Sequence, residues 1–198
     1  MSDVERPRLV VGLSGASGAV YGLRVLDACR ELGVETHLVV SRAAALTLSQ
    51  ETGLTVAQVA EKADVAHRPA DIGAAIASGS FRTLGMVIMP CSIHTASSVA
   101  YCQSDNLLTR AADVVLKERR NLVLAVREAP LSDIHLENML RLSRMGAVVM
   151  PPVPAFYTKP QTLDDIVNHT VARLLDQFGI EVPALARWTG EMGTGGED

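Results

Sequence analysis

The sequence is short of several residue types, and each shortage excludes a class of protein. Only three cysteines occur in 198 residues, they form no Cys-x-x-Cys pair, and the five histidines form no cluster with metal-ligand spacing. We therefore expect neither a disulfide framework nor a bound metal. The 18 basic residues are outnumbered by 22 acidic ones, which gives a net charge of −4. That balance excludes a strongly basic nucleic-acid-binding protein.

Long apolar runs are also missing. No run reaches the roughly 18 residues that a membrane span needs, and the first residues lack the pattern of a signal peptide, so we expect a cytoplasmic protein. Hydrophobic residues nevertheless make up 48% of the chain. We attribute this surplus to strands buried on both faces and to a subunit interface. The length predicts a single domain, over residues 1–189, and the glycine-rich residues 190–198 predict a disordered tail.

Short apolar segments alternate with helical patterns along the chain. This alternation predicts an α/β domain with a mostly parallel sheet and helices on both of its faces. Ligands of such sheets bind outside the carboxyl ends of the strands. The expected strands are 8–13, 36–40, 85–89, 122–126 and 147–150, with a weak edge strand at 64–68. The expected helices are 19–32, a stretch from 41 to 51, 55–61, 95–100, 106–117, 132–144 and a last helix whose apolar stripe runs from Leu163 to Phe178.

Polar segments follow four of the expected strands: Gly15–Gly18, Ser41, Pro90–Thr95 and Arg127–Glu128. The first is a glycine-rich turn that opens a helix, and its amides suit an anion. It is not a Walker loop, because no lysine follows, and its glycine spacing differs from the dinucleotide fingerprint. We therefore predict that it binds the phosphate of a mononucleotide. The same pattern also fits an ordinary turn that binds nothing.

The segment Pro90–Thr95 offers two hydroxyl groups at a strand end. Ser92 and Thr95 could donate to a ligand, although an ordinary helix cap at Thr95 explains the same residues. Cys91, between an apolar strand and these hydroxyls, is interpreted as a small buried hydrophobic residue rather than as a nucleophile.

Charged residues occur in two further patterns. Arg110, Asp113 and Lys117 share one face of a predicted helix, which is also typical of a solvated, salt-bridged surface. Arg127 and Glu128 directly follow a buried strand and are harder to explain as ordinary surface residues. A carboxylate in that position can transfer protons.

Eight segments occur in an order that resembles the UbiX-type flavin prenyltransferase family, over residues 8 to 188. They are Gly15-Ala16-Ser17-Gly18-Ala19, Ala77-Ser78-Gly79-Ser80-Phe81, Pro90-Cys91-Ser92, Asn106-Leu107-Leu108 with Arg110-Ala111-Ala112-Asp113, Leu116-Lys117-Glu118-Arg119, Arg127-Glu128-Ala129-Pro130, His135-Leu136-Glu137-Asn138-Met139 and Pro154-Ala155-Phe156-Tyr157.

The resemblance implies a Rossmann-like, flavodoxin-like flavoprotein. Such an enzyme transfers a dimethylallyl group from dimethylallyl monophosphate to reduced FMN, at N5 and then by ring closure at C6. The product, prenylated FMN, is the cofactor of UbiD-type decarboxylases. The family also implies a homo-oligomer, a dodecamer with sites at subunit junctions, and a metal-independent transferase.

The resemblance further implies roles for individual residues. Acid, base and hydroxyl functions at the reacting centre fall to Ser17, Glu51, Glu128 and Lys117. FMN-binding positions are Gly15, Ala16, Ser17, Ser41, Ser92, Ile93, His94, Thr95 and Arg127. Positions that bind the prenyl phosphate are Lys117, Arg127, Tyr157 and Arg173, and Arg110 and Trp188 match further positions of the site. One departure is Cys102, which occurs where the family commonly has glycine.

Two other functions fit parts of the sequence. A flavin-dependent decarboxylase of the cysteine type shares the fold, but its Pro-Ala-Ser-Ala-Asn-Thr-like segment is replaced here by Pro90-Cys91-Ser92-Ile93-His94-Thr95. A non-catalytic FMN-binding subunit is the other alternative, and the intact set of acidic and cationic residues argues against it.

Overall fold

A computed structural model describes residues 6–183 of the chain. Its six strands form one sheet in the order β3-β2-β1-β4-β5-β6, and every neighbouring pair is parallel. The strand bounds are β1 Arg8–Leu13, β2 Glu35–Val40, β3 Val65–His67, β4 Gly85–Cys91, β5 Asn121–Val126 and β6 Val148–Val149. This confirms the predicted parallel sheet, with β3 as the weak strand at one edge.

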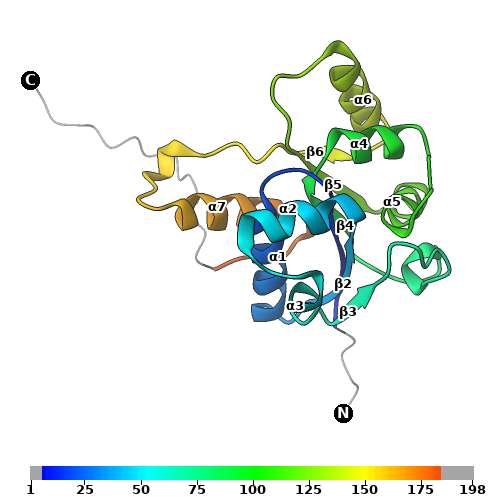
Figure 1. Cartoon of the computed structure of the whole chain (residues 1–198), viewed down its shortest axis with the longest axis horizontal. Helices are drawn as coiled ribbons and strands as arrows, with labels where there is room; N and C mark the ends of the chain where they lie inside the picture. Colours follow the sequence, from blue (N-terminus) through cyan, green and yellow to red (C-terminus); the bar gives the residue numbers. More distant parts are fainter. Residues whose placement is uncertain (1–5, 184–198) are drawn as a thin grey trace, which may run out of the picture.

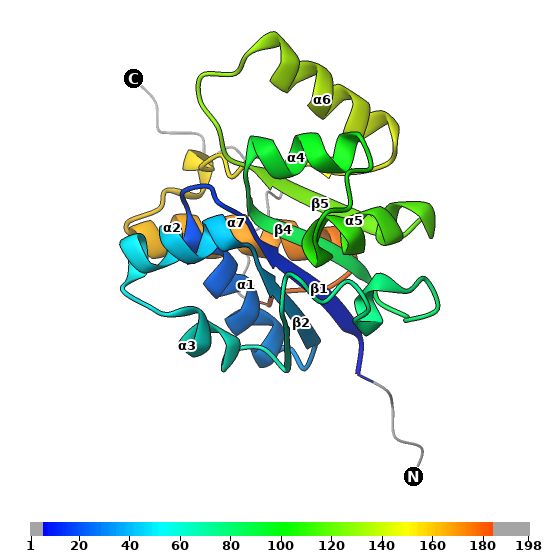
Figure 2. The ribbon, with the colours of Figure 1, turned by 45° about the vertical axis from the view of Figure 1, so that its right-hand side comes forward.

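Helices cover both faces of the sheet, as the alternation of patterns predicts (Figures 1 and 2). One core contains residues of α1, α2, α3 and α7, and the other contains residues of α4, α5 and α6. Their bounds are α1 Ala19–Glu31, α2 Arg42–Thr52, α3 Val56–Ala60, α4 Ile93–Ala100, α5 Leu107–Lys117, α6 Asp133–Arg144 and α7 Leu163–Leu175. The described residues also contain three short 3-10 helices: η1 Ala75–Ala77, η2 Phe156–Thr158 and η3 Asp176–Phe178.

Strand β1 shows why the central strands are apolar throughout. Leu9, Val11 and Leu13 pack into the core that contains α1, and Val10 packs into the core that contains α5. None of these four side chains is more than 1% exposed. Since alternate side chains of a strand point to opposite faces, a strand covered on both faces needs apolar residues at every position.

The structure corrects the predicted boundary between β4 and α4. The strand continues to Cys91, which pairs with Val126 beyond an irregularity in the ladder. Pro90 lies in that irregularity, because a proline has no N–H to donate to a neighbouring strand. The helix begins at Ile93 rather than at Thr95, and its cap is Ser92, whose hydroxyl accepts from the Thr95 amide.

Two smaller expectations are also wrong. The strand expected at 147–150 is reduced to Val148–Val149. Leu163, expected in the apolar stripe of α7, is 79% exposed. It is the first residue of the helix, and the stripe becomes buried from Val167 onward.

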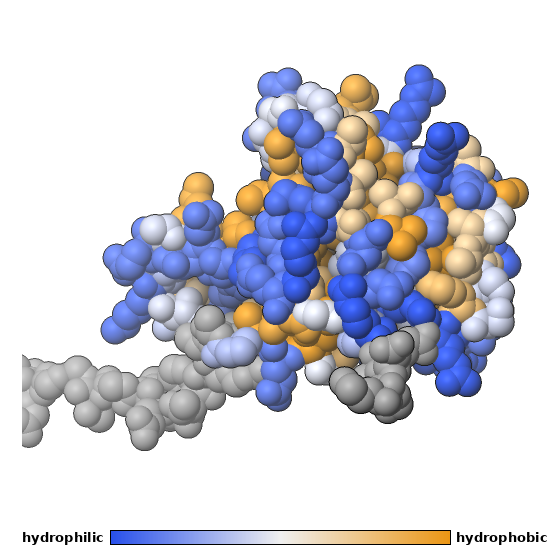
Figure 3. All heavy atoms as spheres, turned by 90° about the horizontal axis from the view of Figure 1, so that it is seen from below, coloured by the Kyte–Doolittle hydropathy of each residue, from blue (hydrophilic) through white to orange (hydrophobic). Residues whose placement is uncertain are grey.

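Apolar side chains remain on the surface of the described chain. Ile134, Leu136 and Leu140 of α6 are each at least half exposed. Figure 3 shows a different face, where apolar atoms again interrupt the polar surface. No helix within residues 6–183 is long and apolar enough to cross a membrane.

Cys102 adopts a backbone conformation that favours glycine. Its φ is +54°, in the left-handed region, which costs a residue with a Cβ about 1–2 kcal/mol. This explains why a glycine suits the position. We expect Cys102→Gly to raise the melting temperature, by somewhat less than that cost implies, because glycine also makes the unfolded chain more flexible. An unchanged or lower melting temperature would contradict this explanation.

Candidate active site

Hydrogen bonds between neighbouring loops bring four strand ends into one row. The Ser41 amide, after β2, donates to Leu13 O of β1 at 2.9 Å. The Ser14 amide, after β1, donates to Pro90 O of β4 at 3.1 Å, and the Arg127 amide, after β5, donates to Cys91 O at 3.0 Å. The predicted segments Gly15–Gly18, Ser41, Ser92–Thr95 and Arg127–Glu128 therefore meet at the carboxyl edge of the sheet.

Ser14 is a residue of this edge to which the sequence analysis gave no role. Its side chain is 1% exposed, donates to Pro90 O at 3.1 Å and accepts from the Ser92 amide at 2.7 Å. It thereby fixes the first turn against the start of α4. A serine at the end of an otherwise apolar strand was the available signal, because a buried hydroxyl needs partners.

Three helices begin at this edge, and their first amides point toward it. Ser41 caps α2 by accepting from the Ala44 amide at 3.1 Å, and Ser92 caps α4 in the same way. The loop before α1 passes very close to α2. A Cβ added at Gly15 would lie 2.4 Å from the Ala43 Cβ. Glycine is therefore required there for the close approach of the two segments.

Glu51 occupies part of the turn that was predicted to bind a phosphate. Its carboxylate accepts from the Gly18 amide at 2.9 Å and from the Ala19 amide at 2.8 Å. The first turn of α1 thus already has an anion at its N-terminus, where the helix dipole favours one. The phosphate site expected at this turn stays a prediction, and the first turns of α2 and α4 offer further amide donors at the same edge.

The environment of Glu51 favours its ionised form. Burial raises the pKa of this carboxyl, but hydrogen bonds from the Ala19 amide, the Ser17 hydroxyl and the Gly18 amide, together with the charge of Arg127, lower it by more. Glu51 is therefore an anion at this edge, near enough to Arg127 to be affected by its charge.

The lowered pKa of Glu51 predicts a pH dependence of stability. The contribution of the carboxylate is fully present above its ordinary pKa of 4.5 and is lost as the pH falls through the lower folded value. We expect Glu51→Gln to be less stable than wild type near neutral pH, and the difference to shrink in acid. Melting temperatures between about pH 7 and pH 3 check this, with exposed Glu61→Gln as the control. A constant difference across that range would contradict it.

The start of α4 carries the remaining predicted flavin-binding residues. Thr95 is buried and Ile93 half-buried, whereas His94 is exposed. Cys91 is fully buried, and burial raises the pKa of its thiol to about 12. This confirms Cys91 as a buried hydrophobic residue, because a neutral thiol is a poor nucleophile.

Arg127 and Glu128 are both exposed at the end of β5. Glu128 Oε1 accepts from the amide of Ala129 at 3.1 Å. An exposed carboxylate at this edge can reach a ligand by rotating its side chain. Proton transfer requires the carboxylate to come within hydrogen-bonding distance of the ligand.

Lys117 does not lie with these residues within one protomer. It is the last residue of α5, just before β5 begins at Asn121, so it lies at the amino edge of the sheet. Arg120, three residues later, donates to Phe81 O and Gly79 O, both 2.6 Å away and just before β4. The six residues of β5, about 20 Å of strand, separate this edge from Arg127. Lys117 itself forms an ion pair with Glu118.

The remaining predicted residues lie in three places. Arg110 belongs to α5 and forms an ion pair with Asp113 at 2.9 Å. Tyr157 and Arg173 lie by α7, where the Tyr157 hydroxyl is 3.3 Å from His169 Nε2 and Arg173 pairs with Asp176 at 2.7 Å. Trp188 and the tail 190–198 lie outside the described residues. Among residues 6–183, no three His, Cys, Asp or Glu side chains are grouped to hold a metal ion.

Comparison with known proteins identifies the family. A family model described as Flavoprotein matches residues 2–175. A probable UbiX-like flavin prenyltransferase from Streptomyces sp. (strain D7) is 60% identical over 184 residues, which cover 92% of each chain. The chain belongs to the UbiX-type flavin prenyltransferase family. The resemblance found in the sequence segments is thereby confirmed.

Solved structures of UbiX-type proteins share the fold closely. AnUbiX (PadA1), solved in complex with FMN and dimethylallyl pyrophosphate, is 47% identical with a TM-score of 0.93, over 95% of this chain and all of that one. A dodecameric FMN-dependent UbiX-like decarboxylase from Escherichia coli O157:H7 is 56% identical with a TM-score of 0.90, over 92% of this chain and all of that one. Cysteine decarboxylases such as TvaF, at 16% identity and a TM-score of 0.60, share the fold alone with this UbiX-type chain.

Proposed function

We propose that this protein is a flavin prenyltransferase, which transfers a dimethylallyl group from dimethylallyl monophosphate to reduced FMN and makes prenylated FMN. The observation that carries this proposal is the row of strand ends. The glycine-rich turn, the hydroxyls and the charged residues of this row match the family motif. Membership of the family supports the same function. The cysteine-type decarboxylase has weaker support, because its solved members resemble this chain only in fold.

The carboxyl edge fits a flavin mononucleotide. Hydroxyls of Ser41 and Ser92 and the first amides of α2 and α4 offer donors to a phosphate. Glu51 already occupies the amides of α1, so we assign the flavin phosphate to the other donors. Bound there, reduced FMN supplies the nucleophilic ring that accepts the prenyl group.

The prenyl donor needs cations around a departing phosphate. Arg127, Tyr157, Arg173 and Lys117 match the family positions for this task, and together they can stabilise the leaving anion without a metal. One protomer does not complete this set, because Lys117 lies at the opposite edge of the sheet from Arg127. We therefore propose that Lys117 reaches the site from a second copy of the chain, with Arg110 on the same helix.

Glu128 is proposed to accept the proton that the flavin carbon loses when the new ring closes. The residue next to it, Arg127, faces the same edge and is close enough to Glu51 to lower its pKa. Ser17, whose hydroxyl donates to Glu51, is proposed to lie near the reacting nitrogen. Glu51 and Ser17 are thus proposed to form a hydrogen-bonded pair that contacts the flavin.

The same proposal includes the oligomeric state of the enzyme, its location in the cell and the use of its product. The exposed apolar side chains of α6 support a homo-oligomer, and a solved relative at 56% identity is dodecameric. We propose a dodecamer located in the cytoplasm, whose product serves a UbiD-type decarboxylase. Residues 1–189 are proposed to form its single flavin-binding domain.

Phosphate release tests this function against the alternatives. The protein is incubated without oxygen with reduced FMN and dimethylallyl monophosphate, and inorganic phosphate is measured. In a parallel arm with the pyrophosphate donor, the pyrophosphate released is measured. We expect release that requires reduced FMN and persists in excess chelator. Absence of release from either donor, with carbon dioxide formed from a peptide ending in cysteine, would favour the decarboxylase instead.

A further inference from the structure

His169 lies beside a residue of the proposed donor site, and nothing in the family motif includes it. It is on the second turn of α7, half-buried, with Nε2 3.3 Å from the Tyr157 hydroxyl. The two rings are nearly perpendicular, with their centroids 5.8 Å apart. The Tyr157 hydroxyl therefore has a partner that can change its protonation near neutral pH.

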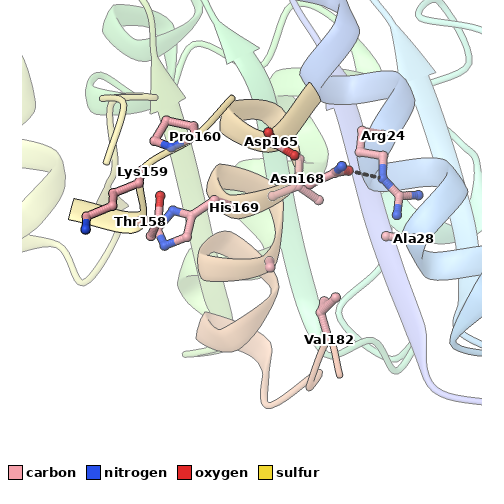
Figure 4. A pocket seen from close by; sticks show the side chains of 11 residues that line it. Arg24, Ala28, Thr158, Lys159, Pro160, Asp165, Asn168, His169 and Val182 are labelled. Atoms are coloured by element: carbon pink, nitrogen blue, oxygen red, sulfur yellow. Dashed lines mark hydrogen bonds between the residues drawn. The ribbon is translucent and has the colours of Figure 1, made fainter. Parts of the chain in front are cut away.

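Several charged residues lie around His169. Arg173 and Asp165 are one turn away from it on α7. Lys159, after η2, and Arg24, of α1, line the same cavity as His169, and Arg24 is directed to Asn168 (Figure 4). The Asp165 carboxylate is engaged by the amides of Gln161 and Thr162. Burial, and then the charge of Arg173, lower the pKa of His169. The imidazole is therefore mostly neutral near pH 7 when no ligand is bound.

His169 lines a cavity that allows it to exchange protons with solvent. The cavity has a volume of about 380 Å³, opens to solvent and is lined by residues of α1, α7 and the segment after η2. His169 thus contacts both this cavity and the Tyr157 hydroxyl.

We propose that His169 is a positioning residue that turns the Tyr157 phenol toward the phosphate of the prenyl donor. The inference rests on the proposed function, because it assumes that Tyr157 binds that phosphate. When Nε2 carries a proton, as it does in the imidazolium and in one of the two neutral tautomers, it donates to the phenol oxygen, and the phenol proton is then directed away from His169, toward the phosphate. When Nε2 is bare, it accepts the phenol proton, and Tyr157 has nothing to donate to the donor.

Donor binding is then coupled to protonation of His169. The anionic phosphate beside Arg173 offsets the positive field that lowers the pKa of the imidazole, so binding raises that pKa. By linkage, the donor binds with proton uptake and more weakly as the pH rises through the pKa of the complex. The donor phosphate itself titrates near pH 6, but this affects every variant alike.

Three variants separate this role from a structural one. His169→Leu removes the hydrogen bond and is expected to raise the donor KM about 3- to 10-fold, as loss of one modest hydrogen bond does, with kcat within about twofold. His169→Gln keeps a side-chain N–H that can donate to Tyr157, and should restore most of the wild-type KM. Tyr157→Phe should raise the donor KM, and adding His169→Leu to it should have no further effect.

A purely structural role of His169 would not change the pH profile, so this profile distinguishes the two roles. The donor kcat/KM of wild type, divided by that of His169→Gln at each pH, is expected to fall with rising pH across the titration of His169. A flat ratio, or an unchanged KM in His169→Leu, would overturn the inference. An unchanged KM in Tyr157→Phe would overturn it together with the placement of Tyr157, whereas continued product formation by wild type would leave the prenyltransferase function intact.

Discussion

Replacing Lys117 with alanine is expected to lower kcat/KM for the prenyl donor about 10- to 150-fold, because a charge-assisted contact to a phosphate contributes roughly 1.5–3 kcal/mol. The amine complements the charge of the phosphate as the carbon–oxygen bond breaks. FMN binding should be unchanged, since Lys117 is proposed to contact the phosphate of the prenyl donor and not the flavin. Steady-state phosphate release and a flavin titration measure the two effects separately.

A matched lysine controls for loss of surface charge. Lys62 also forms an ion pair, with Asp27 at 2.8 Å, on a segment outside the proposed site. We expect Lys62→Ala to keep wild-type activity. Equal activity of Lys117→Ala and wild type would remove Lys117 from the donor site.

Mixed oligomers test whether Lys117 serves another protomer. Lys117→Ala and Glu128→Gln chains, each carrying a different tag, are co-expressed, and oligomers that contain both are purified. If each site takes Glu128 from one copy and Lys117 from another, some sites of the mixed oligomers take Glu128 from a Lys117→Ala chain and Lys117 from a Glu128→Gln chain. Those sites have both wild-type residues, so the activity of the mixed oligomers should exceed that of either variant alone. Activity equal to the mean of the two variants would mean that each site is built from one chain.

Glu128→Gln is expected to slow product formation by about 10²- to 10⁴-fold, the usual contribution of a general base. Glutamine keeps the size and the hydrogen bonding of the side chain but cannot accept the proton. Affinities for FMN and for the donor should therefore stay close to wild type, in contrast to Lys117→Ala, which should weaken the donor. Single-turnover kinetics and equilibrium binding distinguish the two patterns.

Two outcomes would contradict the role of Glu128. Turnover at the wild-type rate would mean that another group takes the proton, and Glu51 is the next candidate because it lies at the same edge as an anion. Loss of FMN binding would instead make Glu128 a structural residue. Glu61→Gln, an exposed carboxylate at the end of α3, is the control for removal of one negative charge.

The local features of the fold could be predicted from the sequence. Uninterrupted apolar segments such as Arg8–Leu13 identify strands buried on both faces, and caps such as Ser132 identify the start of α6. Because parallel strands share an edge, the order of elements also predicted that Ser41, Ser92 and Arg127 would meet. These inferences depend only on short-range pattern and on the geometry of parallel sheets.

Contacts between distant segments could not be predicted in this way. The carboxylate at the first turn of α1 comes from Glu51, more than 30 residues away, because α2 passes over that turn. The extension of β4 to Cys91 depends on its pairing with Val126, which no local pattern encodes. The position of Lys117 at the amino edge follows from the direction of α5, and a motif match alone does not report it.

The mass of the flavin product tests the proposed function most directly. The protein is incubated without oxygen with reduced FMN and dimethylallyl monophosphate, and the released flavin is analysed by mass spectrometry. The expected product has the mass of FMN plus one five-carbon prenyl unit, and it is absent when the donor is omitted. Recovery of FMN at its original mass, from protein that has bound both compounds, would contradict the assignment as a flavin prenyltransferase.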